Sequence, residues 1–405
     1  MRCLIVDDSK VSATMFQQVL EEGGHLTRVV HDSRQARAVA LDWRPDAILL
    51  DLMMPHIDGF TLLRDLKQQS SLADTCLIVV SSKPYDADRR RAMTLGAAGF
   101  IPKITAREHL LGRIMQIIDD RLRIRFWGVR GTLPVPGPHS LRYGGNTSCV
   151  SLEFPDGRLF IFDAGSGIKE LASQLMAERP GKLSAQLFIS HPHWDHINAL
   201  PFFLPLYVKS NEFEILGPGH GERGIEDLIS AQMDGVFFPV TVSEFAAHIR
   251  YRDLQEGKHE VEGAQVETML LKHPGQCLGY RVRYGDRSIC YVTDNELYPE
   301  ELPWFEAEYR DRLVDFVRGA DLLITDSTYT DAEYANKVHW GHSPLSEVAS
   351  LAHEAQVGSL CLFHHDPDQD DNAIDAKLAF VQHKLQALGS KTQVLAPAEG
   401  SELRV

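Results

Sequence analysis

Four side chains of the kinds that bind metal ions lie within six residues, directly after a short apolar segment. In LFISHPHWDH, residues 187–196, the apolar part predicts a strand, and the candidate ligands that follow it are His191, His193, Asp195 and His196. Imidazole and carboxylate groups are ligands of divalent transition metals. Four of them in one loop can divide between two adjacent ions, so this segment predicts a dinuclear metal site at the end of a strand.

Three more candidate ligands occur at the ends of apolar segments further along the chain. His273 follows ETMLLK, Asp294 ends SICYVTD and His364 ends SLCLFH. Together with the four residues of the first loop they make five histidines and two aspartates. Two ions that share one bridging carboxylate require a set of this kind.

Acidic side chains also stand at strand ends in the first 123 residues. Apolar segments alternate with helical patterns there, which predicts a parallel sheet with helices on both faces. Asp7 and Asp8 follow CLIV and Asp51 follows AILL, and the carboxyl ends of parallel strands meet at one edge of a sheet. Converging carboxylates favour Mg²⁺, while the Ser81 hydroxyl and the Lys103 ammonium after the next two strands suit phosphoryl oxygens.

With these residues in place, residues 1–123 resemble a response-regulator receiver domain, an α/β fold with a doubly wound, parallel, five-stranded sheet. The resemblance implies Asp51 as the phosphoacceptor, Mg²⁺ bound by Asp7, Asp8 and Asp51, and Ser81, Phe100 and Lys103 as the residues that respond to phosphorylation. One departure is Pro102, which precedes the lysine where many receivers have a proline after it. The resemblance also implies a cognate sensor histidine kinase as partner.

Residues 124–405 resemble the metallo-β-lactamase superfamily, a four-layer αββα fold, and within it the phosphodiesterase branch that includes ribonuclease Z-like hydrolases. Carried over by position, the resemblance assigns one ion to His191, His193 and His273 and the other to Asp195, His196 and His364, with Asp294 as the bridge. Asp163, in the segment LFIFD, corresponds to a residue that supports the ligand loop. Zn, Mn and Fe all suit such ligands, so the identity of the two divalent ions stays open.

The same resemblance extends to residues around the metal site. It implies His342 in HWGHSP as the proton donor to the leaving group, Asp326 in LLITDST as the residue that orients it, and Asp195 as a further catalytic residue. Arg130 and Asn146 lie in a Gly-rich segment that either contacts a substrate phosphate or only closes a turn. His365 either contacts the substrate or supports the ligands.

Length and charge limit the organisation of the chain and its partners. At 405 residues the chain exceeds an ordinary single core, which predicts two domains, at 1–123 and 124–405. The first has 17 Lys and Arg against 16 Asp and Glu, and the second has 24 against 40. Such an acidic second domain disfavours long nucleic acid, because affinity for nucleic acid comes mostly from cationic contacts with phosphates.

Apolar segments and cysteines indicate the cellular environment. The most apolar segments, such as residues 199–208, are shorter than a membrane span requires, so we expect no membrane contact. Six scattered cysteines form no Cys-x-x-Cys pair, which predicts reduced thiols in the cytoplasm.

We therefore expect a two-component response regulator whose output domain is a metal-dependent phosphodiesterase. A compact substrate, such as a cyclic nucleotide or a cyclic dinucleotide, suits the acidic domain. We expect phosphorylation of Asp51 to act through an amphipathic helix over 105–122, which passes directly into IRFWGV, and to alter either domain docking or a receiver-mediated homodimer.

Other functions compete with this one. A nuclease on short RNA or DNA would need a basic stripe beside the metals, and a signalling adaptor would use the same fold without catalysis. The metal ligands are also compatible with a carbon-centred hydrolase such as a lactonase, although His342 and Asp326 favour phosphoesters. A di-iron oxygen-reducing enzyme is disfavoured because that branch of the superfamily typically has Glu at the position of His193.

Overall fold

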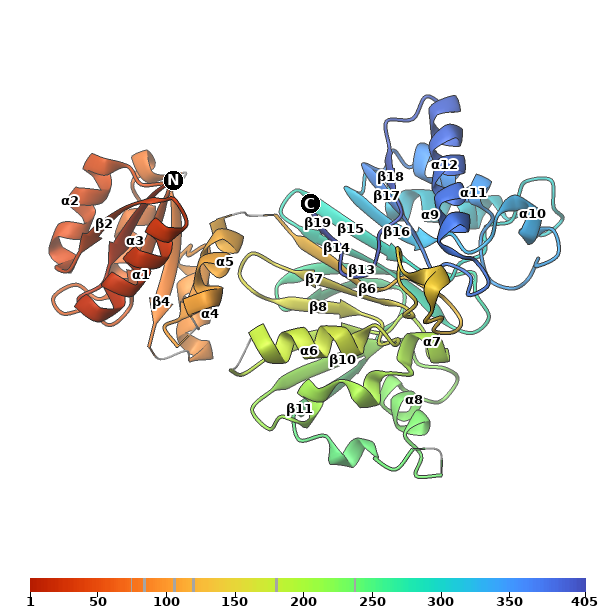
Figure 1. Ribbon diagram of the computed structural model, residues 1–405, viewed down its shortest axis with the longest axis horizontal. Coiled ribbons are helices and arrows are strands. Elements are labelled where there is room, and N and C mark those ends of the chain that lie inside the picture. The colour runs from red at the N-terminus through yellow and green to blue at the C-terminus, as the bar shows by residue number, and fades with distance from the viewer. Residues whose placement is uncertain (74, 83–84, 105–106, 119–120, 179–180, 237) are drawn as a thin grey trace. The chain divides into compact units, whose positions relative to one another are not determined.

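The chain forms two compact units, each with its own sheets and apolar cores (Figure 1). One unit consists of Met1–Leu122 together with Glu153–Arg158, and the other of Arg123–Leu152 together with Leu159–Val405. The structure, a computed structural model, describes residues 1–73, 75–82, 85–104, 107–118, 121–178, 181–236 and 238–405.

The first unit contains a parallel sheet with the strand order β2-β1-β3-β4-β5. Its strands are β1 (Arg2–Val6), β2 (Leu26–Val30), β3 (Ala47–Asp51), β4 (Cys76–Ser81) and β5 (Gly99–Pro102). Its helices are α1 (Lys10–Glu22), α2 (Ser33–Trp43), α3 (Gly59–Lys67), α4 (Asp86–Thr94) and α5 (Arg107–Ile118), with a 3₁₀ turn, η1, at Ser70–Leu72. Alternate residues of the central strands pack against α2, α3 and α4 on one face and against α1 and α5 on the other. This arrangement confirms the predicted doubly wound, five-stranded fold.

Two details of this unit differ from the sequence prediction. No continuous apolar segment marked β2, because its residues alternate between exposed and partly buried and only Val30 is buried. β2 lies at the edge of the sheet, where one strand neighbour and partial solvent contact do not require a fully apolar strand. Of the helix expected over 105–122, the structure has α5 at Arg107–Ile118, and positions 105, 106, 119 and 120 lie outside the described residues.

The second unit contains two seven-stranded sheets, with the orders β11-β10-β9-β8-β7-β6-β19 and β12-β13-β14-β15-β16-β17-β18. The strands of the first sheet are β6 (Arg123–Gly128), β7 (Cys149–Glu153), β8 (Leu159–Phe162), β9 (Ser184–Phe188), β10 (Glu212–Gly217), β11 (His248–Asp253) and β19 (Glu402–Arg404). Those of the second sheet are β12 (Gly257–Val261), β13 (Ala264–Leu271), β14 (Cys277–Tyr284), β15 (Arg287–Val292), β16 (Leu322–Asp326), β17 (Ser359–Phe363) and β18 (Gln393–Leu395).

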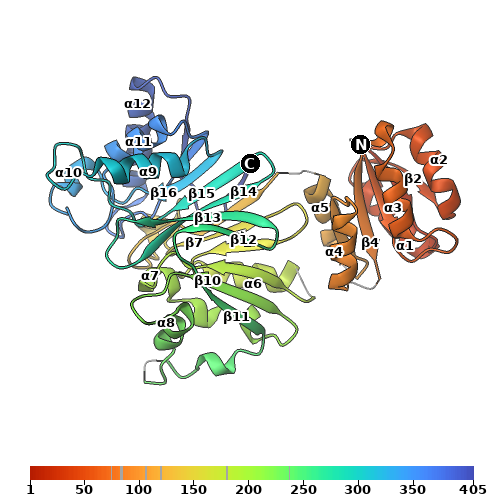
Figure 2. The ribbon, with the colours of Figure 1, turned by 180° about the vertical axis from the view of Figure 1, so that it is seen from behind.

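Helices cover the outer face of each of these sheets (Figures 1 and 2). The helices of this unit are α6 (Ile168–Glu178), α7 (Trp194–Ile197), α8 (Ile225–Gln232), α9 (Ala307–Val317), α10 (Asp331–Tyr334), α11 (Leu345–Glu354) and α12 (Asp371–Ala387). Short 3₁₀ turns are η2 (Pro138–Ser140), η3 (Leu200–Phe202), η4 (Leu204–Tyr207) and η5 (Val242–Glu244). One apolar core joins α6 and α8 to the first sheet, and another joins α9, α11 and α12 to the second.

Aromatic side chains fill the space between the two sheets. The ring of Phe162 in β8 lies 5.9 Å from that of Tyr280 in β14 and 5.2 Å from that of Tyr291 in β15, measured between centroids. Phe188 at the end of β9 contacts Tyr280 at 5.3 Å. The order is therefore helix, sheet, sheet, helix, which confirms the predicted four-layer fold.

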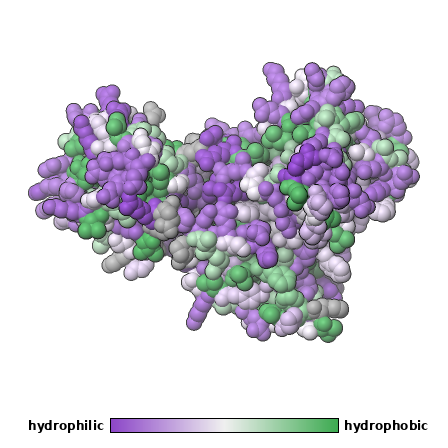
Figure 3. Space-filling view, in the orientation of Figure 1, coloured by the Kyte–Doolittle hydropathy of each residue, from purple (hydrophilic) through white to green (hydrophobic). Residues whose placement is uncertain are grey.

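The surface and the cysteines agree with a globular chain. Hydrophilic residues predominate on the face seen in Figure 3, with smaller groups of hydrophobic residues between them. Within the described ranges, no helix has the length and apolar character needed to cross a membrane. No disulfide joins the cysteines that the structure describes.

Candidate metal centre

Strand ends from both sheets of the second unit bring the candidate ligands together. β8 and β9 are parallel, and the 189–196 loop follows β9. In the other sheet β15, β16 and β17 are parallel, and β13 has the same direction because both β13 and β15 are antiparallel to β14. Strands that run in one direction end at one edge. The two edges adjoin, because Asp195 Oδ2 lies 3.1 Å from His364 Nε2 although 169 positions separate these residues in the sequence.

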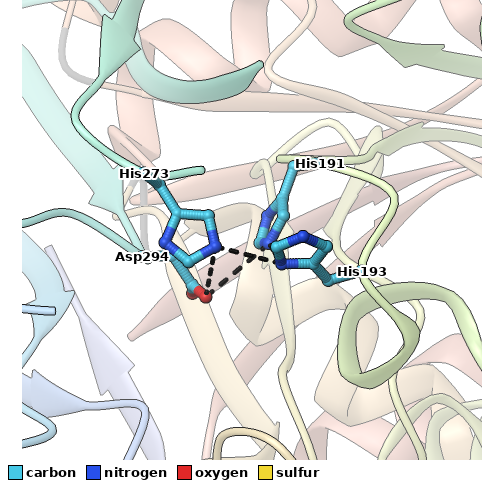
Figure 4. A group of neighbouring side chains, drawn as sticks. All are labelled: His191, His193, His273 and Asp294. Carbon is cyan, nitrogen blue, oxygen red and sulfur yellow. Dashed lines mark hydrogen bonds and ion pairs between the residues drawn. The ribbon is translucent and has the colours of Figure 1, made fainter. Parts of the chain in front are cut away.

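His191, His193, His273 and Asp294 form a first group of donors, whose ligand atoms all lie within 4.8 Å of one another. His193 Nδ1 is 2.9 Å from His191 Nε2 and 3.0 Å from His273 Nε2. Asp294 Oδ2 is 3.6 Å from each of those two Nε2 atoms, and all four groups point toward a common centre (Figure 4). Two nitrogens bound tetrahedrally to one ion at about 2.0–2.1 Å lie roughly 3.3 Å apart, so this spacing suits a single ion.

Asp195, His196, Asp294 and His364 form a second group of the same size, and all four are buried. His364 Nε2 is 3.1 Å from Asp195 Oδ2 and from Asp294 Oδ1. His196 Nε2 is 3.2 Å from the same two oxygens. Asp294 thus turns Oδ2 toward the first group and Oδ1 toward the second, which is the arrangement of a bridging ligand.

The chemistry of both groups fits divalent metal ions. Nε2 of His196 is buried and has no hydrogen-bond partner among the residues that the structure describes, although two carboxylate oxygens face it. A buried nitrogen without a partner is costly unless a ligand satisfies it. Burial lowers the pKa of His191, His193 and His273, so these rings are neutral and each can offer a lone pair. Such a donor set is typical of the divalent ions that the fold implies.

Asp163 supports the ligand loop, as the family resemblance implied. Its Oδ1 accepts a hydrogen bond from the Ser190 amide at 2.7 Å, and its Oδ2 accepts one from the Tyr291 hydroxyl at 2.7 Å. The same oxygen lies 2.7 Å from Nδ1 of His196. This contact fixes the His196 ring so that Nε2 faces the second group, a common arrangement around protein metal sites.

His342 and Asp326 form a buried pair beside the second group. His342 Nδ1 is 2.7 Å from Asp326 Oδ2, and the His342 ring stacks on His364 with centroids 5.0 Å apart. Burial opposes protonation of His342, but the neighbouring Asp326 carboxylate outweighs it and raises the pKa of His342 to about 9. The Asp326 carboxylate therefore favours the protonated form of the His342 ring.

Glu296, which the sequence did not indicate, holds the loop that contains His342. Its Oε1 accepts hydrogen bonds from the His339 amide at 2.7 Å and the Tyr334 hydroxyl at 2.9 Å, and its Oε2 accepts one from the Gly341 amide at 2.8 Å. The Gly341 carbonyl in turn lies 3.0 Å from Nδ1 of His273. Glu296 thus holds the segment that contacts the candidate metal ligand His273 and leads into His342. The one feature of the sequence that connects Glu296 with the site is its position two residues after Asp294.

We expect Glu296→Gln to weaken metal binding by roughly 10- to 100-fold, the usual effect of losing a partner that orients a ligand. The amide can accept through one oxygen only, so an N–H group of the 339–341 segment loses its acceptor and His273 shifts. Competition with a chelating dye measures the affinity. Glu347→Gln, which removes a carboxylate paired with Arg310, is the matched control. Wild-type affinity in Glu296→Gln would contradict the positioning role.

Close packing and a backbone hydrogen bond hold two of the candidate ligands, His364 and Asp195. A Cβ atom on Gly131 would lie 2.1 Å from the ring of His364, so only glycine allows this approach. The amide of Thr132, the next residue, donates to Asp195 Oδ2 at 2.7 Å. His364 itself has a left-handed backbone with a φ of 58°. Such strain in a residue other than glycine is concentrated at functional sites.

For Arg130, Asn146 and His365 the sequence left two alternatives open, substrate contact or a structural role. Arg130 is fully buried, and its guanidinium donates to the carbonyls of Gly144 and Gln369, which gives it a structural role. Asn146 donates to Glu399 and accepts from Ser166, so it closes the Gly-rich turn. His365 is also fully buried, next to but not within the donor groups. The burial of Arg130 and His365 was invisible in the sequence because it depends on distant segments.

The first unit contains the predicted acidic pocket. Ligand oxygens of Asp7, Asp8 and Asp51 lie within 4.8 Å of one another. Lys103 Nζ is 2.6 Å from Asp7 Oδ2 and 2.7 Å from Asp51 Oδ2, so Pro102 before it does not disturb the pocket. Ser81, at the end of β4, and Phe100, in β5, are both buried. The Ser81 carbonyl accepts a hydrogen bond from the Lys103 amide at 2.8 Å.

Sequence models of two families match the chain where these two sites lie. The response regulator receiver domain matches residues 3–115, and the β-lactamase superfamily domain matches residues 158–365. Because the second match covers more than half of the 405 residues, the chain belongs to the β-lactamase superfamily. It combines a receiver domain with a metallo-β-lactamase-fold, ribonuclease Z-like domain.

Individual relatives resemble one part or the other. Ribonuclease Z of Thermoplasma acidophilum is 25% identical over 306 residues, which cover 64% of this chain and 92% of that protein. The response regulator MprA of Mycobacterium avium is 30% identical over 118 residues, 29% of this chain, and the chain spans about half (51%) of that relative's length. The metallo-β-lactamase-fold protein YhfI from Bacillus subtilis has a TM-score of 0.51 at 18% identity, covering 71% of this chain and all of that one, which shows the shared fold.

Proposed function

We propose that the chain is a dinuclear-metal phosphodiesterase that cleaves a small phosphodiester, such as a cyclic nucleotide or a cyclic dinucleotide, under control of a receiver domain. The observation that supports it is the combination of two donor groups sharing Asp294 with the adjacent His342–Asp326 pair. The donor groups alone suit several hydrolytic reactions. A buried proton donor beside them suits an ester with an alkoxide leaving group, which departs slowly unless it is protonated.

The residues of the chain have distinct tasks in this reaction. His191, His193 and His273 would hold one ion, Asp195, His196 and His364 the other, and Asp294 would bridge them. When bound, two such ions activate a water molecule for attack and polarise a phosphoryl oxygen. His342 donates the proton from its Nε2 side to the departing alkoxide, and Asp326 holds the opposite nitrogen, Nδ1, so that the ring keeps its orientation.

Charge supports a compact substrate. Residues 124–405 contain 24 Lys and Arg against 40 Asp and Glu, and long nucleic acid binds through many cationic contacts. A cyclic mononucleotide carries one phosphodiester and a cyclic dinucleotide two, so metal ligation can dominate the binding of either.

A panel of substrates tests the proposal. Protein loaded with Zn²⁺, Mn²⁺ or Fe is offered cyclic mononucleotides, cyclic dinucleotides, a generic p-nitrophenyl phosphodiester and a lactone. We expect hydrolysis of the phosphodiesters, with the cyclic nucleotides preferred. Protein that binds two ions per chain and cleaves no phosphodiester would contradict the proposal.

Short RNA is a second substrate class. The similarity to a ribonuclease Z over 64% of the chain favours it, whereas the acidic charge of the domain opposes it. Adding a short RNA to the panel at low and high salt separates the two classes. Cleavage of RNA that falls steeply with salt, without cleavage of cyclic nucleotides, would favour the nuclease.

We further propose that a sensor histidine kinase supplies a phosphoryl group to Asp51 and that this changes turnover. Lys103 already contacts Asp51 and can hold a phosphoryl oxygen there. A typical coupling of about 1–3 kcal/mol would change activity by roughly 5- to 150-fold. The comparison uses wild type and Asp51→Asn, each with and without beryllofluoride and Mg²⁺, and follows both turnover and oligomeric state. Wild-type protein that responds in neither quantity would contradict regulation by this receiver.

A further inference from the structure

We propose that the cavity beside His273 binds the base of a nucleotide, through the aromatic rings of Tyr298, Trp304 and His339. This inference rests on the proposed function, because it places the phosphodiester of the same nucleotide at the candidate metal centre. The base is the part of the substrate that lies away from the reacting phosphorus, and these three rings would select it.

The cavity adjoins one candidate ligand of the metal centre, His273. Its volume is about 500 Å³, and its lining includes Lys272, His273, Glu296, Tyr298, Trp304 and His339. His273 belongs to the first donor group, and Figure 4 shows its ring turned toward Asp294. One side chain, His273, thus belongs both to the cavity lining and to the first donor group. Pockets for small molecules have volumes of roughly 300–1,000 Å³, so one nucleotide is a suitable occupant.

Aromatic rings form much of its wall. The Trp304 and His339 rings meet edge to face, with centroids 4.4 Å apart and an interplanar angle of 81°. Tyr298 lies 5.6 Å from His339 and 6.3 Å from Trp304. Trp304 is 45% exposed, so part of its indole is accessible to a ligand. Every nucleobase presents a flat face that stacks on rings of this kind.

The charged groups of the lining do not favour a second phosphate there. Glu296 already accepts three hydrogen bonds within the protein. Lys272 Nζ is 2.5 Å from Glu306 Oε1, so the ammonium is paired. An anion would meet no uncompensated cation among the described lining residues. The Lys272–Glu306 pair instead offers a donor and an acceptor side by side, which matches the alternating donors and acceptors at the edge of a base.

Backbone geometry shows that His339 is held in place. Its φ is 71°, a left-handed conformation that residues other than glycine rarely adopt. Glu296 accepts from its amide at 2.7 Å, and the Tyr298 hydroxyl lies 2.9 Å from its ring Nδ1. Burial, with the negative charge of Glu296, raises the pKa of Tyr298 to about 12, so that hydroxyl keeps its proton. His339 and Tyr298 are thus held by contacts within the protein, which limits the entropic cost of binding to them.

The test compares Trp304→Ala with Trp304→Phe and with Trp340→Ala. Trp340 is an exposed indole on the same loop as His339 but is not part of the cavity lining. Two substrates with the same leaving group are used, the p-nitrophenyl ester of a nucleoside 5′-phosphate and methyl p-nitrophenyl phosphate. Binding of AMP, GMP, CMP and UMP is measured by calorimetry, with ribose 5-phosphate as the probe without a base.

We expect Trp304→Ala to raise KM for the nucleotide ester by roughly 5- to 150-fold, the usual contribution of one stacked base, and to leave the methyl ester nearly unchanged. Trp304→Phe should recover part of the loss, and Trp340→Ala should behave like wild type. Equal effects of Trp304→Ala on both esters, or equal binding of ribose 5-phosphate and the four nucleotides to wild type, would overturn the subsite. If wild type cleaves neither ester but binds nucleotides through Trp304, the proposed reaction fails and the base site stands.

Discussion

Replacing Asp294 with alanine is expected to abolish hydrolysis and to leave fewer than two metal ions per chain. One oxygen of this carboxylate faces His191 and His273, and the other faces His196 and His364. No other carboxylate in the described part of the chain belongs to both donor groups. Its loss removes a ligand from each ion and leaves two clusters of imidazoles without their shared negative charge.

Metal analysis of the purified variant, together with turnover on the phosphodiester panel, checks this expectation. Asp286→Ala is the matched control, because Asp286 is an exposed aspartate that directly precedes β15, the strand after which Asp294 lies. Circular dichroism shows whether both variants keep the fold. Two ions per chain and wild-type turnover in Asp294→Ala would refute the bridging assignment.

Replacing His342 with alanine is expected to slow cleavage of an alkoxide ester by roughly 10²- to 10⁴-fold while both ions remain bound. His342 is held by Asp326 and stacks on His364, but it is absent from both four-residue donor groups. Its loss should therefore remove the proton for the leaving group and little else. The effect should shrink when the leaving group is p-nitrophenolate, which departs without a proton.

Rates for the two leaving groups, with metal content measured on the same samples, distinguish proton donation from substrate positioning and from metal ligation. His383→Ala, which removes an exposed histidine of α12, serves as the control. A loss of equal size with both leaving groups would show that His342 positions the substrate instead of donating a proton. Loss of an ion would show that His342 is itself a metal ligand. Ligand atoms of His342, Asp326 and His364 lie within 4.8 Å of one another, which is compatible with that role.

Residues at the ends of apolar strands were predictable from the sequence. LFISHPHWDH leaves β9 and ends inside a short helix, α7, which contains Asp195 and His196, and its four candidate ligands belong to the two donor groups. Asp51 and Lys103 are in contact although 52 positions separate them. Such residues are predictable because a buried parallel strand must be apolar throughout, so a polar residue that ends it is conspicuous and its location at the sheet edge follows from topology.

Strands with one exposed face were less apparent. β11 and β12 alternate between exposed and partly buried residues, and no continuous apolar segment marks either of them. Both lie at the edges of their sheets. A strand with a single neighbour and a solvated face needs few apolar side chains, so its sequence differs little from that of a loop.

The sequence by itself therefore determined the two fold classes and the chemical types gathered at each site. Only the tertiary structure decided that Arg130 and His365 are buried, that Glu296 holds the His342 loop, and that an aromatic cavity adjoins His273. A side chain's type and its place at a strand end are local properties of the chain. Its burial, its partners and the cavity that it lines depend on segments far away in sequence, and those contacts exist only when the layers pack together.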